Sequence, residues 1–183
     1  MKVLLGVTSS IAAYRMPNFV SQGHKSGHEF RVIVTEKAQH FVTVQALSTM
    51  SGHRCYTEQD EWGNIDEVIH IQLAKWCDAL MIAPLTANTL AKIANGICDN
   101  LLTCAVRALG DKPLVIAPAM NTRMWENPVT EQHLETLARI YTLTVVEPVE
   151  KRLADGDEGV GALADDSTML ETLSQIDTQI TNS

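Results

Sequence analysis

A short polar stretch after an apolar run is the first place where this sequence could do chemistry. Residues 113–117, Pro-Leu-Val-Ile-Ala, have the length and character of a buried strand. Pro118 has no N–H for a ladder hydrogen bond, so we expect the strand to stop there. Asn121 would then stand at the carboxyl end of the strand. Its amide could bind a ligand there, or could equally well cap the helical pattern that follows.

Two small hydroxyl residues follow the first strand. Residues 2–8 form an apolar run, Ser9 and Ser10 come next, and a helical pattern begins at Ile11. A strand, a hydroxyl-rich turn and a helix make a phosphate-binding layout, because the first turn of a helix has unpaired N–H groups. A plain serine N-cap explains the same pattern. With a single glycine, the turn is neither a dinucleotide fingerprint nor a P-loop.

The same layout returns at two more strand ends. Residues 79–84 are apolar and end in a second proline that should stop a strand, Pro84, and the turn that follows opens a helix. Residues 29–35 form another strand, which Thr35 closes before a helix starts over 36–41. Each of these turns can bind a ligand or simply cap its helix, and position alone does not separate the two.

His70 follows the least regular part of the chain. Residues 51–68 are polar and contain Gly52 and Gly63, so we expect an exposed loop, and long loops within compact domains often carry function. An imidazole titrates near neutrality and suits proton transfer. However, His70 stands within Ile-His-Ile-Gln-Leu, and a histidine beside apolar residues is often a packed core residue. The residues alone leave both interpretations open.

These turns need a scaffold that brings them together. Apolar runs alternate with helical patterns along the chain, and a last strand is expected at 143–146. Such alternation predicts an α/β fold with a mainly parallel sheet and right-handed crossovers. The carboxyl ends of parallel strands lie along one edge of the sheet, where ligands bind. The turns after the strands at 2–8, 79–84 and 113–117 are therefore expected to converge.

The tail combines a glycine-rich segment with a final helix. Residues 153–165 contain Gly156, Gly159 and Gly161, and residues 168–180 are amphipathic. A glycine-rich segment between the body and a docked helix is a candidate lid, and a plain surface loop has the same composition. The spacing of the acidic residues does not fit an EF-hand calcium loop.

Composition narrows the class of protein. The 183 residues carry a net charge of -8, which argues against a general nucleic-acid surface. No apolar run reaches the roughly 18 residues of a membrane span, and the first residues do not make a signal peptide. Four cysteines without a C-x-x-C pair predict free thiols in a reducing cytosol, and the six histidines lack metal-ligand spacing. We therefore expect one cytoplasmic domain without nucleic-acid, membrane or metal partners.

Four motifs together resemble those of the flavin-containing cysteine decarboxylases. The likeness extends over nearly the whole chain and is greatest for the branch that acts on phosphopantothenoylcysteine. The motifs are Gly-Val-Thr-Ser-Ser-Ile-Ala-Ala-Tyr at 6–14, His-Ile-Gln-Leu at 70–73, Ala-Pro-Leu-Thr-Ala-Asn-Thr-Leu at 83–90 with Gly-Ile-Cys-Asp-Asn-Leu-Leu at 96–102, and Pro-Ala-Met-Asn-Thr-Arg-Met-Trp at 118–125. The second and the last are highly specific in combination.

The resemblance implies a fold, a cofactor and an assembly. The fold would be a flavodoxin-like (Rossmann-like), doubly wound parallel sheet in three α/β/α layers, forming one flavoprotein domain over 1–183. Residues 150–166 would be a substrate lid and 167–183 a C-terminal helix. The domain would bind FMN and form a homotrimer or an assembly of trimers, with sites at subunit contacts. The implied FMN contacts are Gly6, Thr8, Ser9, Ser10, Thr35, Phe41, Pro84, Thr86, Ala87, Asn88 and Thr89.

The resemblance also implies a reaction. It is the FMN-dependent oxidative decarboxylation of the cysteine carboxylate of 4'-phosphopantothenoylcysteine, giving 4'-phosphopantetheine for coenzyme A. His70 would be the catalytic base that takes the thiol proton, and Asn121, with Met120 and Ala119, would hold the carboxylate. FMN would accept a hydride, so that the sulfur end becomes an electron sink for loss of CO₂. The resemblance favours the functional interpretation of both His70 and Asn121.

Two positions depart from the family pattern. Ser9 stands where a glycine is usual, which should only tighten the first turn, and the second departure affects the chemistry. The coenzyme A branch carries Cys-Gly-Asp in its lid, and that cysteine donates a proton in the reductive half of the reaction. Here Asp155 stands at the cysteine position. Asp155 could replace it as a catalytic acid if burial under the lid keeps it protonated. Otherwise the chain is a peptidyl-cysteine decarboxylase that releases an enethiol, or a non-catalytic FMN-binding regulatory paralogue.

Overall fold

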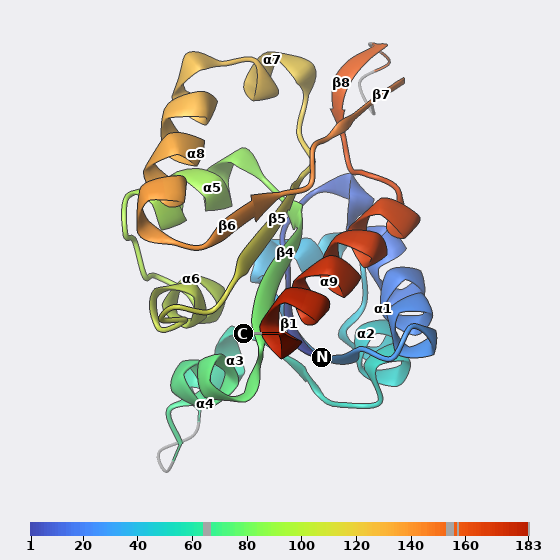
Figure 1. The fold of residues 1–183 in the computed structure, drawn as a ribbon, viewed down its shortest axis with the longest axis vertical. Coiled ribbons are helices and arrows are strands. Elements are labelled where there is room, and N and C mark those ends of the chain that lie inside the picture. The colour runs from blue at the N-terminus through green and yellow to red at the C-terminus, as the bar shows by residue number, and fades with distance from the viewer. Residues whose placement is uncertain (64–66, 153–155, 157, 183) are drawn as a thin grey trace.

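A parallel sheet lies at the centre of the fold (Figure 1), in a computed structural model that describes residues 1–63, 67–152, 156 and 158–182. Its strands are β1 (Lys2–Val7), β2 (Glu29–Val34), β3 (Cys55–Tyr56), β4 (Ala79–Leu85), β5 (Leu114–Pro118) and β6 (Leu143–Val145). Their order is β3-β2-β1-β4-β5-β6, and every neighbouring pair is parallel. This is the Rossmann order, which reverses between β1 and β4.

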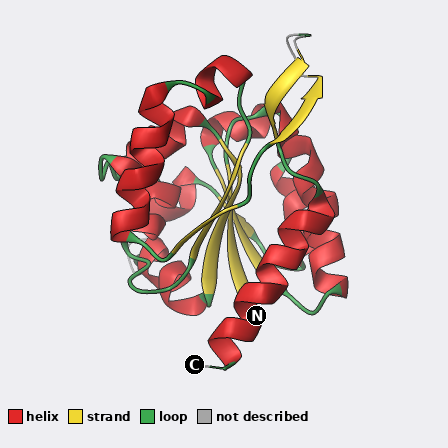
Figure 2. Ribbon diagram, turned by 45° about the horizontal axis from the view of Figure 1, so that its top comes forward, coloured by secondary structure: helices red, strands yellow, loops and turns green. Residues whose placement is uncertain are grey.

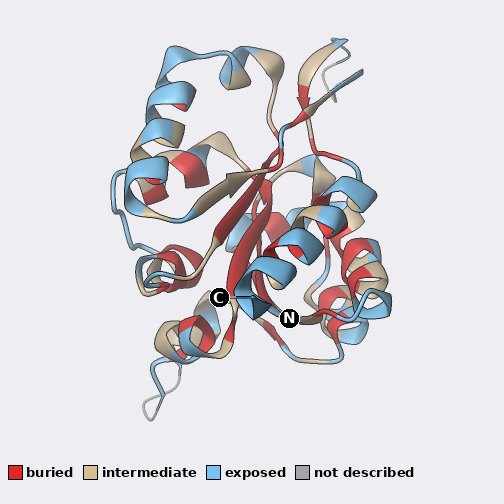
Figure 3. Ribbon diagram, in the orientation of Figure 1, coloured by how far each residue is buried: buried red, intermediate tan, exposed pale blue. Residues whose placement is uncertain are grey.

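Helices cover both faces of the sheet and complete three layers (Figure 2). One face packs against α1 (Met16–Lys25), α2 (Val44–Ser51) and α9 (Asp166–Thr181), and the other against α4 (Ile69–Trp76), α5 (Ala87–Ala94), α6 (Leu101–Arg107) and α8 (Pro128–Ile140). Figure 3 shows buried strands between helices with exposed outer faces. β4 is buried along its whole length, as expected for a strand with helices on both sides. The predicted three-layer α/β fold is therefore confirmed.

Shorter helices connect these layers, and several begin with a side-chain cap. They are the 3₁₀ helices η1 (Ile11–Arg15) and η2 (Glu36–His40), and the α-helices α3 (Glu58–Trp62) and α7 (Thr122–Trp125). Ser10 accepts the N–H of Ala12 before η1, at 3.4 Å, and Thr86 accepts the N–H of Thr89 in α5. The capping role left open for these two turns is therefore present.

The expectation of an exposed loop over 51–68 is wrong in its described part. β3 and α3 both form there. The N–H of Thr57 donates to the Asp60 carboxylate at 2.6 Å, as part of a capping box that starts α3. The polar composition that suggested a loop is thus the composition of a short, capped helix. Residues 64–66 lie outside the described residues.

The expectation that Pro84 stops its strand is also wrong. β4 continues through Pro84 to Leu85, because the missing N–H falls where pairing with β5 is irregular, between Ile82 and Leu85. The carbonyl of Pro84 still accepts a hydrogen bond, from Thr8. Pro118, by contrast, is the last residue of β5, so that strand ends where it was predicted to end.

The tail forms an antiparallel hairpin before α9. β7 (Val149–Arg152) pairs with β8 (Glu158–Ala162), and the hairpin stands beyond the edge of the sheet (Figure 1). The Arg15 guanidinium donates to the carbonyls of Leu163 and Ala164 and to the Asp166 carboxylate, which ties η1 to the start of α9. Within the described part of the chain, no helix is long and apolar enough to cross a membrane.

Candidate active site

Hydroxyl groups join the ends of β1 and β4, where the strand order reverses. Thr8 Oγ1 donates to the Pro84 carbonyl at 2.7 Å and accepts the N–H of Thr86 at 3.0 Å. Thr86 Oγ1 lies 3.3 Å from Thr89 Oγ1. Thr8 is only 1% exposed, so its hydroxyl is committed to this network. Four predicted cofactor-binding residues therefore come together, and their own hydrogen bonds hold the ends of the two strands side by side.

Thr35 and Gly6 also have packing roles at this edge. The N–H and the hydroxyl of Thr35 both donate to the Val7 carbonyl, at 3.1 and 3.3 Å, which joins the ends of β2 and β1. Gly6 lies under α6, where an added Cβ would come within 2.4 Å of a Leu102 methyl group. Close packing against Leu102 therefore favours glycine at this position, whether or not a ligand binds there.

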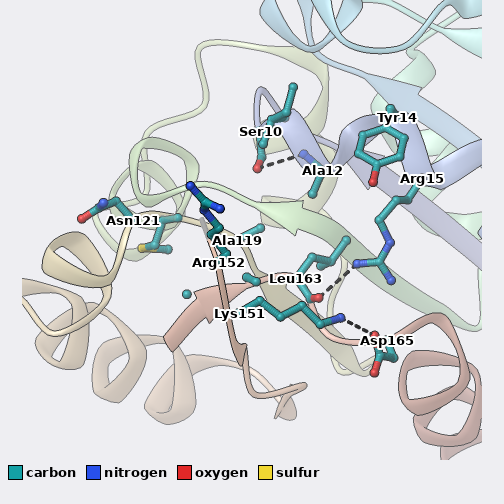
Figure 4. A pocket seen from close by; sticks show the side chains of 14 residues that line it. Ser10, Ala12, Tyr14, Arg15, Ala119, Asn121, Lys151, Arg152, Leu163 and Asp165 are labelled. Carbon is teal, nitrogen blue, oxygen red and sulfur yellow. Dashed lines mark hydrogen bonds and ion pairs between the residues drawn. The ribbon is translucent and has the colours of Figure 1, made fainter. Parts of the chain in front are cut away.

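A cavity of about 560 Å³ opens between the turns that follow β1 and β5 (Figure 4). Ser10 lines it from the turn after β1, and Ala119, Met120 and Asn121 line it from the turn after β5. The hairpin supplies another wall. The structure thus brings four predicted site residues from two distant parts of the sequence to one cavity.

Close backbone contact holds the hairpin against this cavity. The N–H of Met120 donates to the Gly161 carbonyl at 2.9 Å. A Cβ at Gly161 would lie 2.2 Å from the Met120 carbonyl oxygen, and its φ of +153° disfavours any L side chain. A Cβ at Gly159 would meet Thr122 Oγ1 at 2.4 Å. These glycines, expected to make a flexible or tightly turned segment, allow β8 to lie directly on the Asn121 turn.

Three cationic side chains line the cavity, although the chain is acidic overall. Arg15 is held by carbonyls and by Asp166. Lys151 donates to Asp165 at 2.7 Å, and this hydrogen bond lowers the pKa of that carboxyl. Arg152 has no ion pair with the part of the chain that the structure describes. Sequence reasoning missed all three, although Lys151 and Arg152 are adjacent basic residues just before the glycine-rich segment.

Asn121 performs one of its two suggested roles in this structure. Its Oδ1 accepts the N–H of Arg123 at 2.8 Å, so it caps α7. The same side chain lines the cavity, so capping does not exclude contact with a ligand. Its amide nitrogen carries two N–H groups and is the end of the side chain that can donate to a carboxylate.

His70 lies near the start of α4 and does not line the cavity. Its ring Nδ1 contacts one oxygen of the Glu61 carboxylate, and the other oxygen accepts the His70 backbone N–H at 3.0 Å. The His70 side chain is 24% exposed, and that of Glu61 only 6%. His70 is therefore not a packed core residue. Sequence reasoning missed Glu61 because its polar stretch was interpreted as a loop. The capping pattern of Thr57 and Asp60 could have predicted the short helix that carries Glu61.

The remaining predicted cofactor-binding residues do not take part in the Thr8–Thr86 hydrogen-bond network. Ser9 and Ala87 are partly exposed, and Asn88 and Phe41 are exposed, at the turns that follow β1, β4 and β2. Asp155 lies outside the described residues.

Comparison with known proteins assigns the family. The flavoprotein family model matches residues 1–176. The chain belongs to the flavoprotein family. This flavoprotein is 46% identical to the phosphopantothenoylcysteine decarboxylase of Oryza sativa subsp. japonica over 177 residues, which cover 94% of this chain and 79% of the relative.

Two solved structures are similar to this flavoprotein in both sequence and fold. One is a mutant PPC decarboxylase complexed with pantothenoylaminoethenethiol, with a TM-score of 0.87, 45% identity and coverage of 95% of this chain and 96% of that one. The other is the FMN binding protein AtHal3, with a TM-score of 0.83, 45% identity and coverage of 95% of each chain. These matches confirm the resemblance predicted from the motifs.

Proposed function

We propose that this flavoprotein is an FMN-dependent carboxy-lyase that decarboxylates the cysteine carboxylate of 4'-phosphopantothenoylcysteine, in the cytoplasm, for coenzyme A biosynthesis. The cavity carries this proposal. It places an amide donor, Asn121, and a cationic strand, Lys151 and Arg152, around one space. The proposed substrate has a carboxylate at one end and a phosphate at the other, and these donors suit both groups.

The turns that follow β1 and β4 have a donor set that fits FMN. Ser9 and Ser10 offer hydroxyls for a phosphate, and the exposed amide of Asn88 offers donors and an acceptor for a ring. The Thr8–Thr86 network supports these turns from below. When bound, FMN supplies a hydride acceptor for the thiol carbon of the substrate. The residues proposed to hold it are those predicted from the sequence.

Asn121 and His70 would act on opposite ends of the reacting cysteine. Asn121 would donate to the carboxylate and fix the direction in which CO₂ leaves, and Ala119 and Met120 would pack beside it. His70 would accept the thiol proton at Nε2, since Nδ1 faces Glu61.

We further propose a homotrimer, or an assembly of trimers, in which His70 of one subunit serves the cavity of another. His70 and Asn121 do not share a cavity in the described structure. Exposed apolar side chains flank both sites: Trp62 is 75% exposed near His70, and Tyr14 is 65% exposed at the cavity. Contact between subunits would bury both. Light scattering tests this proposal, and a fully active monomer would contradict it.

The tail would control access within one domain of residues 1–183. Residues 150–166 would cover the substrate, and 167–183 would anchor them through α9. Asp155 would then be the candidate acid for the reductive half-reaction. The alternatives remain an enethiol-releasing peptidyl-cysteine decarboxylase and a non-catalytic FMN-binding paralogue.

A single anaerobic turnover of the yellow holoenzyme with phosphopantothenoylcysteine distinguishes these three hypotheses. The products are identified by mass spectrometry. Phosphopantetheine is the expected product. A product two hydrogens lighter, with the flavin left reduced, would mean that the reaction stops at the enethiol. Absence of CO₂ would overturn the proposal and favour a peptide substrate or a binding role. Repeating the reaction with an Asp155→Asn variant tests the acid, because an unchanged rate of flavin reoxidation would remove Asp155 from that role.

A further inference from the structure

We infer that Glu61 is a positioning residue for His70: its carboxylate holds the neutral imidazole as the Nδ1–H tautomer and leaves Nε2 as the basic nitrogen. This inference rests on the proposed function, in which His70 accepts a proton. It goes beyond the family motifs, because they include neither Glu61 nor the tautomer of the His70 ring.

The two oxygens of Glu61 both contact the same histidine. One faces ring Nδ1, and the other accepts the His70 backbone N–H at 3.0 Å. An ionised carboxylate has only acceptors, so Nδ1 must carry the proton in this contact. The backbone contact fixes the carboxylate relative to the start of α4. Glu61 therefore orients the ring and selects its tautomer together.

The two side chains in this contact differ in how far they are exposed to solvent. The Glu61 side chain is 6% exposed, whereas the His70 side chain is 24% exposed. The contacted edge of the ring is thus turned inward, and the ring keeps some access to solvent. None of the hydrogen bonds among the described residues uses Nε2. An imidazole held at one nitrogen by a shielded carboxylate is the arrangement that positions a general base in many hydrolases.

The neighbouring carboxylates have other partners. Both oxygens of Glu58, on the same short helix, lie 3.0 Å from the N–H of Leu101 at the start of α6. Asp99 pairs with Lys92 at 2.6 Å. The capping box that begins at Thr57 starts the helix that carries Glu61. Glu61 is therefore the carboxylate dedicated to His70, and Glu58 provides a matched control.

The tautomer can be measured directly, without substrate. Solid-state ¹⁵N spectra of histidine-labelled holoenzyme report which ring nitrogen is protonated, and a His70→Asn variant identifies the signal among the six histidines. We expect Nδ1–H for neutral His70 in the wild-type protein. An Nε2–H ring there would overturn the inference, whether or not any variant folds. This result is independent of turnover, so it is separable from failure of the proposed function.

A Glu61→Gln variant then tests the consequence. Glu61 uses one oxygen for the ring and the other for the backbone N–H, and Gln replaces one of these oxygens with an NH2 donor, so one of the two N–H groups of His70 would lose its acceptor in this geometry. We expect the ring to shift toward Nε2–H and kcat to fall on the order of 100-fold, with KM changed less than about twofold. Glu58→Gln keeps an acceptor for Leu101 and removes the same charge, so it should leave the tautomer unchanged. Equal effects of the two variants on tautomer and kcat would reduce Glu61 to a structural role.

Discussion

The Asn121 region and the His70 region each hold a polar side chain in a fixed position, but they do so through different kinds of contact. Asn121 stands in a turn that is covered by a separate hairpin, and its neighbours approach it through backbone contacts that only glycine permits. His70 stands on a helix, and a shielded carboxylate holds its ring. The first region has a cavity and cationic side chains. The second has one ring nitrogen of His70, Nε2, that the Glu61 contact leaves as the proton acceptor.

This difference indicates that the two regions have separate roles, one in binding the substrate and the other in proton transfer. The proposed substrate has two charged ends and needs space and donors, and the Asn121 region has both. A proton acceptor needs a fixed ring and a defined tautomer, and the His70 region has those. Since each region contains what the other lacks, each should fail in its own way when it is altered. The following variants test that separation, from the largest expected effect to the smallest.

His70→Asn should have the largest effect, and only on chemistry. Removing the proton acceptor should lower the rate of CO₂ release by about 1,000-fold or more, because general base catalysis contributes on that scale. The visible absorbance of bound FMN should remain. His133→Asn, on α8, is the control and should be fully active. Undiminished turnover in His70→Asn would remove His70 from the mechanism.

The His70 site also marks where prediction from sequence stopped. Apolar runs gave the main strands, since buried parallel strands have a continuous apolar pattern. Short elements fixed by polar contacts, such as α3 and the hairpin, have no such pattern. Asn121 was found because a motif carries it. Glu61 contacts His70, nine positions away in sequence, and Arg152 lines the same cavity as Asn121, 31 positions away, and neither relation leaves a pattern in the sequence. Pro84 misled because its missing donor falls at an irregular point of the sheet.

Asn121→Asp should be the next most damaging change, and it should act on binding. A carboxylate at this position would face the carboxylate of the substrate, and the like charges would repel. We expect kcat/KM to fall about 100-fold. The α7 cap should survive, because Asp also accepts the N–H of Arg123. Steady-state kinetics checks the fall, and normal activity would mean that the carboxylate binds elsewhere.

Arg152→Gln should have a smaller effect that depends on the substrate. If Arg152 binds the phosphate, its loss should lower kcat/KM about tenfold for the phosphorylated substrate, which is about 1.4 kcal/mol. Pantothenoylcysteine, which lacks the phosphate, should be processed equally by both proteins. Arg139→Gln is the control, because Arg139 pairs with Glu135 on α8, away from the cavity. A loss shared by both substrates, or weaker FMN binding, would assign Arg152 another role.

Thr8→Val should have the mildest effect on catalysis and act mainly on stability. The variant removes the hydroxyl that joins Pro84 and Thr86 and leaves the Thr86 N–H without that acceptor. The free energy of unfolding should fall by about 1–3 kcal/mol. Thermal unfolding of the holoenzyme measures this, with Thr136→Val on α8 as the control, because that hydroxyl makes only a local hydrogen bond to the Gln132 carbonyl. An unchanged midpoint would show that the network contributes little.

The placement of His70 outside the cavity that Asn121 lines has a genetic consequence. If one subunit supplies the base and another the carboxylate site, a His70→Asn allele and an Asn121→Asp allele damage different halves of a shared centre. A cell that expresses both would assemble some mixed oligomers in which one intact centre remains. Two alleles that are each unable to support growth would then complement one another, although both lie in a single gene.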